Sequence, residues 1–208
     1  MQEPSGGFIN KRLQERQVAR RSPGRPRSET VRQSLLIAFK KLILRDGYRH
    51  MTIESVADEA RVSRTTVYRW YKSKADIALD ALTELSSQVP AVEDQGSFEA
   101  DLIMFMQPTF AAMRENRLLF GGVVADAQSD PLVAEALRDR FILLRMSVFR
   151  IIFDRAAQRG EIHKGIEIEF VRDLVYGPAW YRMLLGHAAL DVAFANQLVI
   201  AVVKSCAA

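Results

Sequence analysis

The sequence predicts an all-α protein in which a small N-terminal head of three helices, with a helix-turn-helix, joins a larger C-terminal helical domain. Apolar residues recur at helical spacing behind helix-capping residues from Glu29 almost to the end of the chain, and no strand pattern interrupts them. Basic charge is concentrated in the first third of the sequence. We expect a basic arm at residues 1–27, the head at 28–76 and the larger domain at 77–208.

The distribution of charge along the sequence indicates what kind of molecule the head binds. Residues 1–76 carry 17 Lys and Arg against 8 Asp and Glu, a net charge of +9, whereas residues 77–208 carry −5, for an overall formal charge of +4. A basic head beside an acidic remainder indicates that only the first part binds a polyanion such as DNA. The alternative is a solvated charge run, but the charge coincides with the helix-turn-helix.

The composition excludes several classes of protein. Half of the residues, 49%, are apolar, which suffices for a buried core, yet no apolar run approaches the ~20 residues of a membrane span. The polar, basic start lacks the apolar core of a signal peptide, so we expect a cytoplasmic protein. The one cysteine, Cys206, excludes an internal disulfide, and three scattered histidines lack metal-ligand spacing. We expect no metal and no cofactor.

The N-terminal arm, residues 1–27, has seven basic residues and no sustained apolar periodicity, which predicts disorder. Arg25 and Arg27 flank Pro26 in a run typical of extended arms that enter the minor groove of DNA. A charged tail that only raises non-specific affinity is an equally open alternative.

Three helices are predicted in the head. The first covers residues 29–45, with one apolar stripe and Gly47 as its stop. The second follows Thr52 as N-cap, and the third follows Ser63 as N-cap, with a tight turn between them. Two short capped helices separated by a tight turn predict a helix-turn-helix, although any small helical domain can contain such a pair.

The third helix presents a polar face opposite the buried Val67. Stepping about 100° per residue from Val67 turns Thr65 and Arg69 outward, with Thr66 and Tyr68 flanking them. Arg64 lies in the first turn, from which recognition helices reach base edges. Side chains of these types donate hydrogen bonds to phosphates and bases, so we predict that they contact DNA.

The next helix begins behind Ser73, with Asp76 completing a capping box. Lys74 lies in its first turn, where its ammonium and the neighbouring amides are placed to hold a phosphate. After a loop at 88–96, we expect helices at 98–115, kinked at Pro108, and at 118–127, 131–160, 167–186 and 191–205.

The larger domain contains no phosphate loop, nucleophile elbow or acid–base pair, so we expect no enzyme activity. Its adaptable apolar side chains predict either ordinary core packing or a ligand pocket, and the helix breaks at Pro108 and Pro178 favour a pocket. The candidate pocket residues are Met104, Phe105, Phe120, Phe141, Trp180, Tyr181 and Met183.

The last two predicted helices have broad apolar faces, and no later segment of the sequence is available to cover them. Packing against a second copy would bury these faces and would also present two helix-turn-helix heads to successive turns of DNA. We therefore predict a homodimer through the last two helices.

The run from Thr30 to Leu82 resembles the TetR family of bacterial transcriptional regulators. The resemblance lies in Asp46-Gly47-Tyr48, in the spacing from Thr52 to Ser63, and in Val67-Tyr68-x-x-Tyr71-x-Ser73-Lys74. The segment from Tyr176 to Leu184, and the one from Leu190 to Phe194, also look like regulatory domains of some family members. Two positions differ from the usual family pattern. Arg61 stands in the turn where family members often have a small residue, and Trp70 stands where they often have histidine.

The resemblance implies an all-helical dimer with a ligand-binding, dimerising C-terminal domain. It implies base contacts at Arg64, Thr65, Thr66 and Tyr68, and phosphate contacts at Thr52, Tyr68, Trp70 and Lys74. We expect a repressor that leaves its double-stranded DNA operator when a small apolar effector enters the pocket. The alternative is a ligand-independent DNA-binding accessory factor whose larger domain only dimerises or binds a protein partner.

Overall fold

The computed structural model describes residues 29–87 and 93–207. Over these residues it is helical, with one isolated β-bridge between Ile162 and Ala207, which confirms the all-α prediction. The elements are α2 (Glu29–Asp46), η1 (Tyr48–His50), α3 (Ile53–Glu59), α4 (Arg64–Tyr68), α5 (Lys74–Ser87), α6 (Phe98–Glu115), α7 (Arg117–Ser129), α8 (Pro131–Leu137), the π-helix η2 (Arg138–Ile142), α9 (Leu143–Gln158), α10 (Ile168–Leu185) and α11 (Val192–Cys206). The predicted arm, including Arg25 and Arg27, lies outside the described residues.

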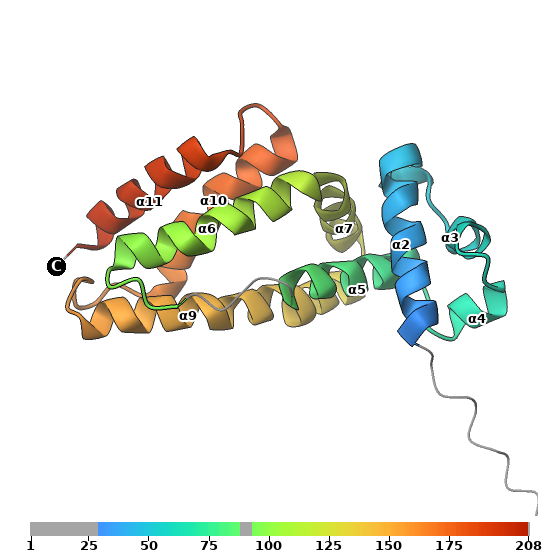
Figure 1. The fold of residues 1–208 in the computed structure, drawn as a ribbon, viewed down its shortest axis with the longest axis horizontal. Helices are drawn as coiled ribbons and strands as arrows, with labels where there is room; N and C mark the ends of the chain where they lie inside the picture. The colour runs from blue at the N-terminus through green and yellow to red at the C-terminus, as the bar shows by residue number, and fades with distance from the viewer. Residues whose placement is uncertain (1–28, 88–92, 208) are drawn as a thin grey trace, which may run out of the picture.

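The head consists of α2, α3 and α4 (Figure 1). Both predicted caps are confirmed, because Thr52 Oγ1 accepts a hydrogen bond from the amide of Ser55 at 3.1 Å and Ser63 Oγ accepts one from the amide of Thr66 at 3.2 Å. Arg61, between α3 and α4, has φ +54°. That left-handed conformation favours glycine, which is the physical reason a small residue suits this turn.

Helix α5 runs from the head into the body (Figure 1), where it packs against α7, α8 and η2. Its predicted capping box is confirmed: the Asp76 amide donates to Ser73 Oγ at 3.1 Å, and the Ser73 amide donates to Asp76 Oδ2 at 3.2 Å. Helix α7 stands at the end of the body nearest the head and packs against α2 and η1 (Figure 1).

The body is formed by α5 to α11, and its hydrophobic core is continuous with that of the head. Helices α6 and α11 pack side by side, with the rings of Phe110 and Phe194 stacked at 5.7 Å. Pro108 lies inside α6 and Pro178 inside α10, and both helices continue past their prolines. In the described part of the chain, no helix is long and apolar enough to cross a membrane.

One predicted helix contains an irregular turn. The single helix expected at 131–160 is instead α8, the π-helix η2 and α9 in succession, with Asp130 as the predicted N-cap. A π-helical turn inserts one residue into the helical repeat and often occurs at functional sites. Here it lies where Arg138, Phe141 and Ile142 border the main cavity of the body.

Candidate DNA interface and ligand cavity

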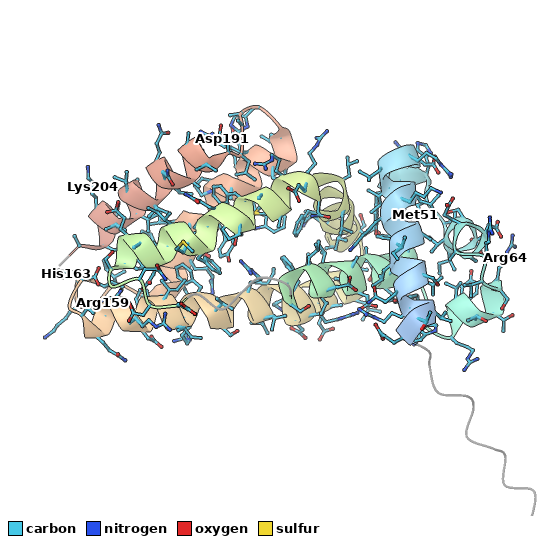
Figure 2. All side chains as sticks on the ribbon, in the orientation of Figure 1. Met51, Arg64, Arg159, His163, Asp191 and Lys204 are labelled. Atoms are coloured by element: carbon cyan, nitrogen blue, oxygen red, sulfur yellow. The ribbon has the colours of Figure 1, made fainter. Side chains whose placement is uncertain are left out.

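Helix α4 presents a polar face to solvent. Val67 is fully buried, whereas Arg64, Thr65 and Arg69 are exposed and half of Tyr68 (50%) is exposed. Figure 2 shows Arg64 at the outer edge of the head, on the side away from the body. The structure thus brings the predicted base-reading side chains to one accessible end of the molecule.

Two of these side chains are oriented by local contacts. The Tyr68 hydroxyl donates to Glu54 Oε1 at 2.8 Å, which lowers the pKa of Glu54 and raises that of Tyr68. Thr66 Oγ1 and Ser63 Oγ lie 2.8 Å apart and share a hydrogen bond. Glu54, on α3, was not among the predicted site residues, because only the folded turn brings the first turn of α3 beside α4.

The predicted phosphate-binding residues lie before α3, just after α4 and at the start of α5. Thr52 is exposed and Trp70 is half-buried against the core. The ammonium of Lys74 lies 4.5 Å from the ring centre of Tyr48 and donates to the Tyr48 carbonyl at 3.3 Å. The amides of Lys72 and Ser73, expected to be available for a phosphate, already donate to Asp76 Oδ2.

A cavity of about 670 Å³ lies in the body, between α5, α6, α7, the α8–η2–α9 segment and α10. This volume is within the range of small-molecule sites. Phe120, Phe141 and Trp180 line it, as the pocket prediction expected, and the Phe120 ring meets those of Phe141 at 5.4 Å and Trp180 at 5.6 Å. We call the rings of Phe120, Phe141 and Trp180 the aromatic wall of the cavity.

The other four candidate pocket residues do not line this cavity. Met104 and Tyr181 are largely exposed, at 54% and 58%, whereas Phe105 and Met183 are buried in the core. Helical periodicity identifies the apolar residues of a helix but not which of them face a gap between helices. Phe105 contacts the cavity lining from the core, because the Arg145 guanidinium lies over its ring at 4.6 Å.

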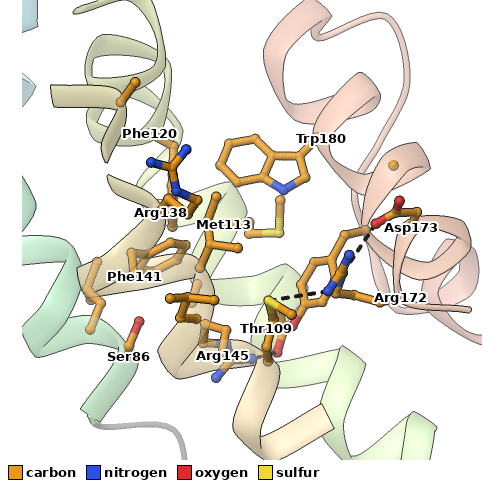
Figure 3. Close-up of a pocket in the computed structure, with 18 residues that line it drawn as sticks. Ser86, Thr109, Met113, Phe120, Arg138, Phe141, Arg145, Arg172, Asp173 and Trp180 are labelled. Carbon is orange, nitrogen blue, oxygen red and sulfur yellow. Dashed lines mark hydrogen bonds and ion pairs between the residues drawn. The ribbon is translucent and has the colours of Figure 1, made fainter. Parts of the chain in front are cut away.

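Polar residues of the cavity were absent from the sequence prediction. Arg145, Thr109 and Ser86 line it (Figure 3), and Tyr176 is a further lining residue. One sequence signal identifies Arg145: it stands midway between Phe141 and Phe149, at the four-residue spacing of the inward face of one helical segment. An arginine at such a position is unusual, because charged side chains are seldom buried without a partner.

Helix α7 links the cavity to the head. Phe120, near its start, lines the cavity, while Gly122 and Asp126 on the same helix meet Tyr48 of η1. The Tyr48 ring also packs edge-on against Phe39 of α2, with centroids 6.4 Å apart. Helix α7 therefore contacts both the cavity and Tyr48 of the head.

Comparisons with known proteins agree with this arrangement. Residues 35–81 match the model of the bacterial regulatory proteins of the tetR family, and residues 92–202 match the tetracyclin repressor-like C-terminal domain. An uncharacterized HTH-type transcriptional regulator, YdeS of Bacillus subtilis, is 29% identical over 179 residues, covering 85% of this chain and 90% of that protein. The DNA-binding transcriptional repressor TetR of Mycobacteroides abscessus is 28% identical over 179 residues, covering 83% and 92%.

Solved structures show the same fold. The TetR family transcription regulator SCO0332 matches with a TM-score of 0.69 at 27% identity, covering 86% of this chain and 99% of that one. FadR of Bacillus subtilis, solved in complex with stearoyl-CoA, matches in fold with a TM-score of 0.71 at 17% identity, covering 83% and 97%. Since the C-terminal match alone spans more than half of the sequence and the other covers the helix-turn-helix, the chain belongs to the TetR family of bacterial transcriptional regulators.

Proposed function

We propose that this regulator is a homodimeric repressor that binds an operator through α3 and α4 and is released when a small, largely apolar molecule enters the body cavity. The observation that carries the proposal is the double role of α7, which lines the cavity at Phe120 and holds the head at Tyr48. The match to the tetR-family model supports DNA binding, and we propose a cytoplasmic location.

For DNA reading, we assign base contacts to the exposed face of α4. Arg64, Thr65 and Arg69 are long or polar donors that reach outward from a short helix, as groove contacts require. Tyr68 and Thr66 join them with hydroxyls held in place by Glu54 and Ser63. We assign Thr52, Trp70 and Lys74 to contacts with the phosphate backbone, which fix the register of the head on DNA.

For dimerisation, we assign the outer faces of α10 and α11. Phe170, Tyr181 and Leu184 are exposed at helical spacing along α10, and Ile200 is exposed on α11. These two helices lie side by side on the outside of the body (Figure 1). A two-fold axis there would cover the apolar stripe with its own copy and set the spacing of two heads.

Release follows from that spacing. A ligand shifts an equilibrium only when it binds one conformation more tightly than another, so the effector must favour an α7 position that separates the heads wrongly for successive major grooves. The contact of α7 with Tyr48 provides the physical connection.

The test begins with selection of a preferred sequence from random DNA by the full-length protein. Binding of that sequence is then measured by fluorescence anisotropy at fixed salt for Thr65→Ala and Arg69→Ala. Each should weaken specific binding, with a loss of ~1 to 3 kcal/mol for the arginine if its contact is bidentate. Arg150→Ala, an exposed arginine on α9 in the body, is the control that should bind as the wild type does. Wild-type affinity in both head variants would overturn the assignment of α4.

A further inference from the structure

Three polar atoms in the cavity wall are buried without a hydrogen-bond partner among the described residues. They are Ser86 Oγ on α5, Arg145 Nη1 on α9 and the Tyr176 hydroxyl on α10. A buried polar atom without a partner costs free energy, so native proteins rarely leave several at one place. Three such atoms beside one cavity suit an occupant that carries hydrogen-bonding groups.

The guanidinium of Arg145 is held in position but is not neutralised. Only 7% of Arg145 is exposed; its Nη2 donates to Thr109 Oγ1 at 2.6 Å, and its plane lies over the Phe105 ring at 4.6 Å. Within residues 29–87 and 93–207, no carboxylate forms an ion pair with it. An arginine cannot escape burial by losing its proton, so the site retains an uncompensated positive charge.

Neighbouring groups reinforce the preference for an anion. The cavity lining contains three arginines, Arg138, Arg145 and Arg172, against one carboxylate, Asp173, which accepts a hydrogen bond from Arg172 at 3.2 Å. Burial raises the pKa of Tyr176, although the nearby Arg145 opposes the shift, so the phenol keeps its proton and can donate to an anion at neutral pH.

Polar groups gather along one edge of the cavity and aromatic rings along another, although the Arg138 side chain lies beside Phe120. In Figure 3, Ser86, Arg145 and Thr109 lie along the lower edge of the cavity, whereas Phe120 and Trp180 lie along the upper edge. The aromatic wall is joined by Met113 and Leu143, which are apolar and adaptable. An occupant that satisfies both edges has a charged head and an apolar body.

We propose that the effector of this regulator is an amphipathic anion, a carboxylate or phosphate on an apolar chain or ring system. Its anionic head binds Arg145 Nη1, with the Tyr176 and Ser86 hydroxyls as further donors, and its apolar body lies against the aromatic wall. The inference rests on the proposed ligand-released function and narrows the chemistry of the ligand from apolar to acidic.

The test compares three probes that share one ten-carbon chain: decanoate, decanamide and decyl phosphate. Isothermal titration calorimetry against the full-length protein measures each affinity. Decanoate or decyl phosphate should bind about 10-fold to 100-fold more tightly than neutral decanamide, because a hydrogen-bonded charge is then paired inside the protein. Whichever of decanoate and decyl phosphate binds more tightly identifies the preferred head group as a carboxylate or a phosphate.

Two variants assign the effect to the proposed residues. Arg145→Met removes the charge while keeping the volume, so the acids should lose their advantage over decanamide, and the ligand-free protein should unfold at the same or a higher temperature. Tyr176→Phe removes only the unpaired hydroxyl and should weaken the acids several-fold without lowering stability. Arg117→Met, an exposed arginine on α7 outside the cavity lining, is the control for net charge.

The outcomes separate the two proposals. Equal affinity for decanoate, decyl phosphate and decanamide, or an acid preference that persists in Arg145→Met, would overturn the acidic effector while leaving ligand-released repression standing. Absence of binding by all three probes would overturn the acidic effector as well, and the selected-DNA measurement would still report on the head independently.

Discussion

The hydroxyl of Tyr48 donates a 2.6 Å hydrogen bond to Oδ2 of Asp126 and so joins the head to α7 of the body. Burial, together with this hydrogen bond, raises the pKa of Tyr48, so the phenol remains a donor throughout the physiological range. The ring of Tyr48 lies against Gly122, one turn before Asp126 on the same helix. Tyr48 of the head therefore contacts α7 at both Gly122 and Asp126, and α7 also lines the cavity.

Substitution at Gly122 should disrupt the packing of Tyr48 on α7. A Cβ there would lie 2.2 Å from Cγ of Tyr48, so the ring or the helix must move. Overpacking of this kind costs ~1 to 3 kcal/mol, and we expect Gly122→Ala to lower the free energy of unfolding measured in urea. The adjacent Gly121 provides the control, because a Cβ there meets no atom within 4 Å and Gly121→Ala should stabilise α7 by up to about 1 kcal/mol. Equal behaviour of the two variants would contradict the close packing of Tyr48 on α7.

The Tyr48–Asp126 bond itself can be measured with a double-mutant cycle of Tyr48→Phe and Asp126→Asn. A hydrogen bond to a charged group contributes roughly 1.5 to 3 kcal/mol, and partial exposure of this pair reduces that range. We expect a coupling free energy of about 1 kcal/mol in urea unfolding. Additive effects of the two substitutions would show that the head is held by packing alone.

Asp80 should make stability depend on pH. It accepts hydrogen bonds from Arg32 at 2.8 Å and from Tyr71 at 2.6 Å, and, although burial opposes the shift, these contacts hold its pKa below the usual value. Its contribution is therefore fully present above the unfolded pKa of about 3.9 and is lost as pH falls through the lower folded pKa. Asp80→Asn should be less stable than wild type at pH 7, with the difference shrinking near pH 3. A constant difference across that range would argue against the ionic contact.

At the far end of the body, Arg159 holds a buried carboxylate. Its Nη2 donates to Asp101 at 3.1 Å, and Asp101 is 0% exposed, while Nη1 and Nε bind Asp94 and Glu161. Arg159→Ala would leave Asp101 buried without its cation, a change that typically costs about 3 to 5 kcal/mol. The thermal unfolding temperature should fall steeply for this variant. It should fall little for Arg150→Ala, because the ion pair of Arg150 is exposed. A small change in the unfolding temperature of Arg159→Ala would contradict the proposed contribution of the Arg159–Asp101 ion pair to stability.

The head was more predictable from sequence than the cavity, and the reason is physical. Caps at Thr52, Ser63 and Asp191 act on amides two or three residues away, so local sequence determines them. The cavity depends on how α5 to α10 pack, and residues such as Met104 and Tyr181 cannot be assigned to it from the period of their own helices. Arg145 was identifiable in principle, as a charge at a core position of α9, but its hydrogen-bond partner Thr109 and its neighbour Tyr176 come from other helices.

The central claim, that occupation of the cavity weakens operator binding, predicts a reciprocal effect. The operator Kd is measured by anisotropy with and without decanoate at a concentration that calorimetry shows to be saturating, and the decanoate Kd is measured with and without operator. Both affinities should fall by the same factor, about 5-fold to 150-fold, because linkage between two sites is symmetric. Saturating decanoate in the cavity with both affinities unchanged would contradict the account.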